Sequence, residues 1–566
     1  MKVRRRDVRK CNQFVRCFNR ILFVFAVLMI AGPSLAQTTY TWSGLGANNL
    51  WSTTNNWVSN VAPPSSSSTA IILTGTAQTT NVMNEGGLTL NSLTFASKAG
   101  PFTINQSGSD FFTCSPTTGG ALPHVDQFSS SNQTINFPNT GLQLNSDLLL
   151  GGNGSGSLTI NGQLAGGGGT HLVLNGPYAV TLNTTAANTI FGMVANAGAL
   201  RLASDLAFPN GPFTFGGGTL QLINNLNLTR SIVINGGGGA IDANGFTAAM
   251  SNTSLTITGT GRLIFTNSTG TGASNIAGQL QQTGGLTVSG ANNTVTLSGA
   301  NNFYSGGTTI SGGATLVIDT DTRLGNAANS ITFDGGTLRF SAPTSFNTSR
   351  AIILGAGGGT IDVLSPQPAI GLAGAINGTG SLTKTGPGRI GLLAANTYSG
   401  LTNVNAGSLD IVHNQAAQNS TINLNGGALG FFSPASAPVL GGLSGSGNLT
   451  FGGSLTTLSV GNNNASTTYS GNLSGSLPSG LTKIGTGTWT LSGNNSQSGL
   501  FNIAAGSIVL GSATAVSPNS TINLSSGAIL DLNGFTCIPG PGASNFSGTI
   551  RMQFGSIVDN PSSNIT

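Results

Sequence analysis

The chain has 566 residues, of which 86 are glycine, and only 6% of its residues are charged. Its formal net charge is +5, but eight of the 19 basic residues lie among the first 20 positions, so we expect no basic patch for nucleic acid in the remainder. Residues that favour long solvated helices are scarce, whereas glycine, asparagine, threonine and serine favour short strands and tight turns, so the composition predicts an all-β protein.

Residues 1–36 have the features of a secretory signal peptide. Basic residues precede the apolar run ILFVFAVLMIA at positions 21–31, and Ser34 and Ala36 place small side chains where a signal peptidase requires them. The run has eleven residues, whereas a membrane-spanning helix needs about 20. We therefore expect cleavage between Ala36 and Gln37, and a mature chain of formal charge −2 without a membrane-spanning segment.

Residues 37–141 differ from the rest of the chain, and we expect them to form an N-terminal tryptophan-rich cap with irregular first rungs. Trp42, Trp51 and Trp57 lie within 16 residues, although the whole chain has only four tryptophans. A stack of repeats exposes an apolar end unless other residues cover it, and large aromatic side chains can do so. The alternative is that the three tryptophans are exposed and coplanar, and form a carbohydrate-binding surface by stacking on sugar rings.

The cysteines and histidines give no pattern of a disulfide framework, a metal site or a catalytic triad. Cys114 and Cys537 are 423 residues apart, too far to meet in a linear array, so each is expected to be a single buried thiol. His124, His171 and His413 are far apart and have no neighbouring cysteine or glutamate. The sequence therefore predicts no metal and no cofactor.

Residues 142–566 repeat one short pattern, in which a glycine-containing corner and a small residue precede two apolar residues separated by one position. The copies are GALRL (198–202), GTLQL (218–222), ATLVI (314–318), GTLRF (336–340), GSLDI (407–411), GALGF (427–431) and GSIVL (506–510). Because successive side chains on a strand point to opposite faces, the two apolar residues face inward and the one between them faces outward. The outward positions hold Arg201, Gln221, Val317, Arg339, Asp410, Gly430 and Val509.

This alternation predicts a β-solenoid, by default a right-handed parallel β-helix, whose short strands are joined by glycine and asparagine corners. No helical periodicity separates the strands, which disfavours a βαβ architecture. Glycine accepts the positive φ angles of tight corners, and asparagine side chains bond the turn backbone. Rungs of about 20 to 25 residues, stacked about 4.8 Å apart, would form a rod on the order of 100 Å long.

Three longer segments are copies of one another: residues 285–318, 381–413 and 480–512. The second and third begin with LTKTGPG and LTKIGTG, which places Lys384 and Lys483 99 residues apart. Their middle parts contain ANTYSG and TLSGNNSQSG, and they end in AGSL and AGSI. The first copy keeps TLSGANNFYSG but lacks the opening lysine, and the third has glutamine at position 497 where the others have tyrosine.

These motifs resemble the autotransporter-associated β-strand repeat, also called the passenger-associated transport repeat, of bacterial type V secretion passengers. The resemblance implies a non-enzymatic exported protein, the passenger or stalk of an autotransporter, which assists its own export and serves as a surface scaffold or adhesin. It implies a location at the cell surface, outside the cell, or in the periplasm if the chain is retained. The implied partners are the outer-membrane translocation machinery and host or matrix polysaccharide. Such passengers precede a translocator barrel, a pattern that we do not find after Thr514, so we expect a truncated passenger or one retained in another way.

The carboxylates raise a second possibility, because right-handed β-helices also include polysaccharide lyases and hydrolases. Asp319, Asp321 and Arg323 form the best group for Ca²⁺ binding or proton abstraction, provided that other charged residues meet them from neighbouring rungs. Asp242 and Asp362 follow matched glycine runs, but they are 120 residues apart, unlike the nonapeptide period of calcium-binding arrays. We expect the Asp319 group to be a solvated turn, and we assign no catalytic, cofactor-binding or metal-ligating residue.

Overall fold

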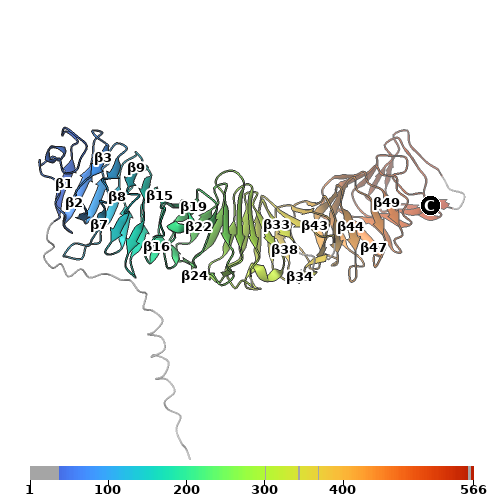
Figure 1. Ribbon diagram of the computed structural model, residues 1–566. Helices are drawn as coiled ribbons and strands as arrows, with labels where there is room; N and C mark the ends of the chain where they lie inside the picture. The colour runs from blue at the N-terminus through green and yellow to red at the C-terminus, as the bar shows by residue number, and fades with distance from the viewer. Residues whose placement is uncertain (1–36, 300, 342–344, 367–368, 559–562, 566) are drawn as a thin grey trace, which may run out of the picture.

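The computed structural model describes residues 37–299, 301–341, 345–366, 369–558 and 563–565. Within these ranges the chain is a parallel β-solenoid of about 22 turns, and Figure 1 shows it as an elongated rod. At about 4.8 Å for each turn, the rod is on the order of 100 Å long. The predicted all-β solenoid is confirmed, whereas the predicted signal peptide lies outside the described residues.

Helical structure in the described ranges is limited to three 3₁₀ turns, namely η1 (Thr54–Asn56), η2 (Asp205–Ala207) and η3 (Asp321–Leu324). None of the helices found there is long and apolar enough to cross a membrane. This agrees with the shortage of helix-forming residues in the composition.

Three long sheets run along the rod. They contain eleven strands from β1 (Thr38–Trp42) to β27 (Gln279–Leu280), fourteen from β3 (Thr80–Met83) to β38 (Ile376–Gly378), and 22 from β20 (Leu226–Asn227) to β60 (Ser563–Ile565). Paired residues in neighbouring strands are as few as 19 positions apart, as for Arg389 and Ser408, and as many as 32, as for Ser92 and His124. Each strand therefore pairs with its counterpart one turn further along the chain, which is the defining feature of a solenoid.

The seven strands that carry the repeated five-residue pattern alternate between inward and outward side chains as predicted, with one exception. The inward apolar residues of β17 (Ala199–Leu202), β31 (Thr315–Ile318), β42 (Ser408–Ile411) and β53 (Ser507–Leu510) are all buried. The predicted outward residues are partly exposed except Asp410, which is only 4% exposed. That prediction is wrong because Arg389 of the preceding rung covers the carboxylate, with Nη2 at 2.7 Å from Oδ2.

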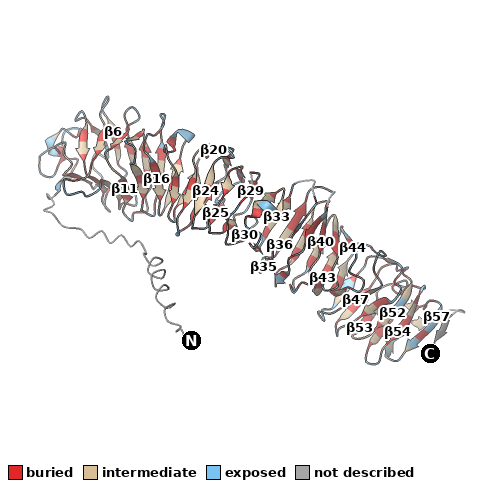
Figure 2. Cartoon of the chain, turned by 90° about the horizontal axis from the view of Figure 1, so that it is seen from below, coloured by how far each residue is buried: buried red, intermediate tan, exposed pale blue. Residues whose placement is uncertain are grey.

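One hydrophobic core runs through the rod from Trp42 to Cys537. Figure 2 shows buried and intermediate residues alternating along its strands. Cys114 and Cys537 are free and buried in this core, which confirms the predicted single thiols, and burial raises the pKa of both to about 12. Because each rung packs mainly on its two neighbours, stability is close to a sum of rung-to-rung interfaces.

The three N-terminal tryptophans lie inside this core rather than on the surface. Trp42 and Trp51 are fully buried and Trp57 is 1% exposed. The Trp57 ring meets those of Trp42 and Trp51 edge-on, at centroid distances of 5.2 and 5.4 Å. The Trp51 indole N–H donates to Asn81 Oδ1 at 3.0 Å, and that of Trp57 donates to the Trp51 carbonyl at 2.8 Å. The exposed, coplanar sugar-binding surface considered from the sequence is therefore wrong, and the burial favours a cap.

We expect Trp57→Ala to loosen the first rungs while leaving the distant ones unchanged. The substitution leaves a cavity beside the two remaining indole rings, and such truncations cost about 3–5 kcal/mol. Hydrogen exchange followed by mass spectrometry should show faster exchange in peptides from residues 37–141 and no change in those from 480–512. The matched control is Val58→Ala, because Val58 is 67% exposed. Equal exchange in the two variants would contradict a capping role.

Candidate functional site

The carboxylate group predicted as the best chemical candidate lies in and beside η3, where arginine holds it. Arg323 donates from Nε and Nη2 to the two carboxylate oxygens of Asp319, at 2.6 and 2.9 Å. The hydrogen bonds from Arg323 lower the pKa of Asp319. A carboxylate whose pKa is lowered is a weaker base, so Asp319 is poorly suited to abstract a proton.

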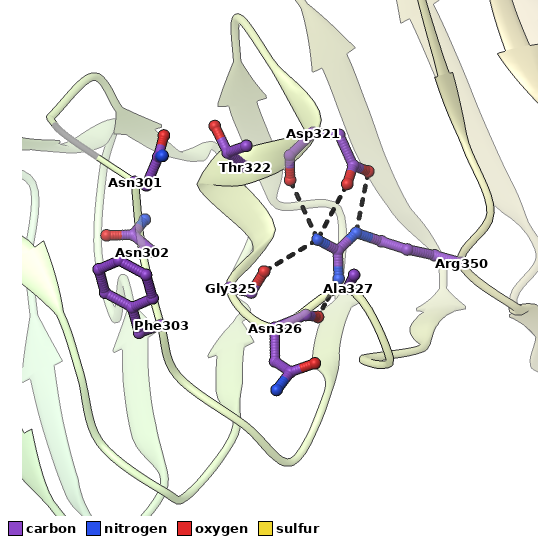
Figure 3. Close-up of a pocket in the computed structure, with 9 residues that line it drawn as sticks. All are labelled: Asn301, Asn302, Phe303, Asp321, Thr322, Gly325, Asn326, Ala327 and Arg350. Atoms are coloured by element: carbon purple, nitrogen blue, oxygen red, sulfur yellow. Dashed lines mark hydrogen bonds and ion pairs between the residues drawn. The ribbon is translucent and has the colours of Figure 1, made fainter.

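Asp321 is bound by Arg350, which no sequence motif singles out and which comes from a neighbouring rung (Figure 3). The Arg350 Nε and Nη2 atoms donate to the two carboxylate oxygens at 2.9 and 3.0 Å. Its other donors reach the backbone carbonyls of Gly325 at 3.0 Å and Asn326 at 2.5 Å. The Arg350 side chain is 1% exposed, so this is a buried cation whose donors are occupied by one carboxylate and the backbone.

A pocket of about 320 Å³ lies beside this pair, lined also by Asn301, Asn302 and Phe303. The enzyme alternative expects charged residues from neighbouring rungs to meet the aspartates, and Arg350 does so. Its guanidinium, however, bonds the chain itself rather than facing a substrate. The pair thus fastens one rung to another and does not present a general acid and base.

The histidines do not assemble a metal site or a triad. His171 Nδ1 lies 3.0 Å from an Asp147 oxygen, and His124 Nε2 lies 3.7 Å from an Asp126 oxygen. His413 Nδ1 accepts a backbone N–H at 3.0 Å. No group of three or more histidine, cysteine, aspartate or glutamate side chains that could hold a metal ion occurs in the described part of the chain.

Asp242 and Asp362, which follow the glycine runs, are buried and bonded across rungs. Asp242 Oδ2 accepts a hydrogen bond from Gln221 Nε2 at 2.8 Å, and its Oδ1 accepts two backbone N–H groups at 3.0 and 2.9 Å. Asp362 Oδ2 accepts from Arg339 Nε at 2.8 Å. Both carboxylate oxygens of Asp242 and Oδ2 of Asp362 are therefore already bonded by the protein.

The repeats bring together a different set of residues, beginning with two lysines whose burial is not evident from the sequence pattern. Lys384 on β39 (Leu382–Thr385) is 0% exposed, and Lys483 on β50 (Gly480–Lys483) is 1% exposed. Each Nζ donates to three backbone carbonyls. The acceptors are Thr385, Gly386 and Ala406 for Lys384, at 2.5, 2.9 and 3.3 Å, and Ile484, Gly485 and Ala505 for Lys483, at 2.8, 2.8 and 3.2 Å.

These contacts explain why three parts of the repeat motif recur together. Each repeat forms two stacked rungs, since β39 pairs with β41 (Thr402–Val404). Two of the carbonyls belong to the corner that follows the lysine, and the third belongs to the Ala-Gly corner of the next rung. At that corner Gly407 has a φ of +66°, and a Cβ atom on it would lie 2.9 Å from the Lys384 Nζ. Lysine, Gly-x-Gly corner and Ala-Gly corner therefore meet at one point.

Carbonyl groups, rather than a bonded carboxylate, surround the two ammonium groups. Burial lowers the pKa of Lys384 to about 8, although the charge of Asp362 acts in the opposite direction. Burial likewise lowers the pKa of Lys483 to about 8. No ion pair of either lysine occurs within the described residues. The charge is held by backbone dipoles of two successive corners, so each lysine links its own rung to the next.

The first repeat shows how the corner forms without lysine. Val288 of β28 (Leu286–Val288) takes the lysine position and is buried. Asn293 Nδ2 donates at 2.8 Å to the carbonyl of Ser289, the residue that directly follows the valine. One corner carbonyl thus keeps a side-chain donor although the cation is lost.

A buried asparagine in each repeat bonds the backbone of two other rungs. The three residues are Asn302, Asn396 and Asn495. In each residue, Oδ1 accepts a backbone N–H from the preceding rung. The donors are Leu280, Ile376 and Leu473, at 2.9, 2.8 and 2.8 Å respectively. The Nδ2 atom of each residue donates to a backbone carbonyl of the following rung, and these acceptors are Arg323, Ala416 and Ala515, at 2.8, 2.8 and 2.6 Å respectively. Asn188, in the sequence AANT that also surrounds Asn396, bonds in the same way to Leu164 and Ala207, at 2.8 and 2.7 Å. This shared tetrapeptide is the sequence signal that could have found the fourth bridging asparagine.

Two residues beyond the asparagine, a tyrosine completes the first two repeats. The Tyr304 hydroxyl lies 2.6 Å from Thr308 Oγ1, and the Tyr398 hydroxyl lies 2.7 Å from Thr402 Oγ1. In the third repeat Gln497 takes this place and is 2% exposed. Neither polar atom of its amide has a hydrogen-bond partner among the described residues. The drift from tyrosine has therefore left an unsatisfied polar group in the core.

The stacked strands form a solenoid in which the bridging asparagine recurs in all three copies and the buried lysine in two of them. Residues 286–318, 382–411 and 481–510 match the family described as Passenger-associated-transport-repeat, so the chain carries three such repeats where they were predicted. The chain is also 33% identical over 226 residues to "Adhesin BmaC autotransporter" of Brucella suis biovar 1 (strain 1330). That similarity covers 37% of this chain and 6% of the relative, so the chain matches only a small part of that protein's length. No solved structure matches the chain significantly.

We expect the double substitution Lys384→Met/Lys483→Met to destabilise the two repeats. Methionine keeps a buried apolar stem but removes the donors to the corner carbonyls, and unpaired buried polar groups cost about 1–3 kcal/mol. Hydrogen exchange in residues 382–411 and 481–510 should become faster, whereas residues 286–318, whose corner has no lysine, serve as the internal control.

The same variant tests the pH dependence of the lysine contribution. The folded chain has a lysine pKa of about 8, below the ordinary value of 10.5. Between these values the unfolded chain binds more protons, so the contribution of the lysines to the free energy of unfolding increases as pH rises. Urea denaturation at about pH 8 and about pH 10 should show the parent gaining stability relative to the variant. A difference that does not change with pH would contradict the lowered pKa.

We expect Gln497→Leu to stabilise the third repeat. Leucine removes a buried amide that lacks partners, a group that costs about 1–3 kcal/mol. Thermal denaturation and hydrogen exchange in residues 481–510 provide the measurement. The matched control is Asn495→Leu, because Asn495 is equally buried but both polar atoms of its amide are bonded, and its loss should destabilise the same rungs. Destabilisation by both leucines would show that Gln497 has partners after all.

Proposed function

We propose that the chain is the passenger or stalk part of an autotransporter-like protein: exported, non-enzymatic, and a scaffold or adhesin at the cell surface. Its repeats assist passage across the outer membrane, and the translocation machinery there is its partner during export. The observation that carries this proposal is that the shared residues of the repeats bond one rung to the next within one continuous rod.

This use of the motif residues favours a structural function over a catalytic one. Lys384, Asn396 and Tyr398 all point into the rod and bond its backbone or side chains. A catalytic motif instead directs its polar groups at space that a substrate can occupy. Rungs whose bonds are completed by the following rung suit a chain that folds progressively after it crosses a membrane, since each added rung lowers the free energy in turn.

The proposal includes the division of the chain inferred from its sequence. Residues 1–36 act as a cleaved signal peptide, 37–141 form the capped start of the rod, and 142–566 form the repeat stalk. The polysaccharide lyase or hydrolase alternative has little support, because Asp319 and Asp321 are both held by arginine.

Surface labelling of cells that carry the chain tests this function. Antibodies against the mature chain should label intact cells, and an external protease should remove the label while a periplasmic marker stays protected. The protein recovered from the surface should begin at Gln37. Labelling that requires permeabilised cells would contradict the surface location, and a retained Met1 would contradict the signal peptide.

A further inference from the structure

Four successive rungs near the N-terminus present the same outward pair of residues. The strands are β6 (Thr103–Gln106), β9 (Gln133–Asn136), β12 (Leu158–Asn161) and β15 (Ala179–Asn183), in the blue to cyan part of the rod in Figure 1. They contain TIN three times and then TLN. The register aligns Thr103, Thr134, Thr159 and Thr181 in one row and Asn105, Asn136, Asn161 and Asn183 in a second.

The asparagine row is bonded to itself. Asn136 Nδ2 donates to Asn105 Oδ1 at 2.7 Å, Asn161 donates to Asn136 at 3.0 Å, and Asn183 donates to Asn161 at 3.3 Å. This ladder fixes the amide planes along the rod, so the face is held in shape before any ligand arrives.

The threonine row, in contrast, has unused hydrogen-bonding capacity. All four threonines are partly exposed, while the residue between threonine and asparagine in each strand is buried. None of the four hydroxyls bonds a side chain or backbone group within the described residues. The strands therefore display free hydroxyls about 4.8 Å apart beside a fixed row of amides.

We propose that this threonine–asparagine face binds an uncharged, extended β-linked polysaccharide laid along the rod. No charged side chain occupies an outward position of the two rows, so the face has no complement for an acidic polymer. Threonine hydroxyls both donate and accept hydrogen bonds, as sugar hydroxyls do. A sugar unit in an extended β-linked chain advances by nearly one rung spacing, so successive units meet equivalent threonines and weak contacts add up.

The next rungs set the length of this face. Arg201 follows Thr181 in the register, and Gln221 and Asp242 follow in turn. Their side chains bond one another, with Arg201 Nε at 2.6 Å from Gln221 Oε1 and Gln221 Nε2 at 2.8 Å from Asp242 Oδ2. At the other end, β3 aligns Thr80 with Thr103 but places Val82 beside Asn105, so the hydroxyl row continues there by one rung without an amide. The two rows together thus span three rung intervals, or about 14 Å.

The test compares the mature chain with two double variants that keep β-branched side chains. Thr134→Val/Thr159→Val removes the middle hydroxyls of the face. The matched control, Thr309→Val/Thr332→Val, removes outward threonines of β30 (Thr308–Ser311) and β32 (Ile331–Asp334), which pair in the same sheet but have no asparagine ladder. Valine keeps the shape and strand preference of threonine.

The probes are cellulose, in a co-sedimentation assay, and cello-oligosaccharides, in calorimetric titration, with polygalacturonate as the acidic comparison. We expect the parent to bind the neutral glucans, with affinity rising from disaccharide to tetrasaccharide and changing little at the hexasaccharide. Loss of two hydroxyl contacts should weaken binding about tenfold in the first variant and leave the control unchanged.

Several results would overturn this inference. The parent could fail to bind glucan or could prefer the acidic polymer. The two double variants could lose the same amount of affinity for the glucan. Finally, the chain could associate with itself through this face, in which case the Thr134 and Thr159 substitutions would abolish that association. The inference deepens the proposed surface function and rests on it, because the polymer must lie outside the cell. The glucan-binding inference and the proposed surface function can fail separately, because surface labelling and cleavage before Gln37 do not depend on glucan binding.

Discussion

The rod depends on how its corners satisfy the backbone. Within a strand, each N–H and carbonyl bonds the rungs on either side, but at a corner the chain leaves the sheet and those partners are lost. A solenoid repeats this problem at every turn, on the border of a dry core. In this chain, side chains supply the missing hydrogen bonds. The lysine and asparagine of the repeats bond backbone groups at the corners, and the tyrosine bonds a neighbouring hydroxyl group.

The repeat motif is therefore best understood as a description of two stacked rungs. Lys384 contacts its own corner and, through Ala406, the next one, while Asn396 reaches the backbone of Ile376 and Ala416 on either side. The copies also show which parts can change. Valine at position 288 is accompanied by a donor from Asn293, whereas glutamine at position 497 has no such compensation in the described structure.

The pairing of aspartates with arginines also has a consequence for function. Asp319, Asp321, Asp362 and Asp410 are each bonded to an arginine, and three of these four pairs join different rungs. These arginines occupy the four carboxylates, whereas the threonine–asparagine face leaves a regular row of uncharged hydroxyl groups available to a partner. That property agrees with a surface scaffold whose contacts are numerous and individually weak.

The sequence by itself determined the all-β class, the inward and outward sides of the strands, the three repeats and the buried thiols. These features follow from a two-residue strand period and from local corner chemistry, both of which are visible in neighbouring residues. Only the tertiary structure decided that Arg350 binds Asp321, that Asp410 is covered by Arg389, that the tryptophan rings are buried, and that the repeat lysines lie in the core. Arg350 and Asp321 are 29 residues apart, and Lys384 and Ala406 are 22 apart. Such contacts are set by the length of each turn and the register of the rungs, which exist only once the chain has stacked upon itself.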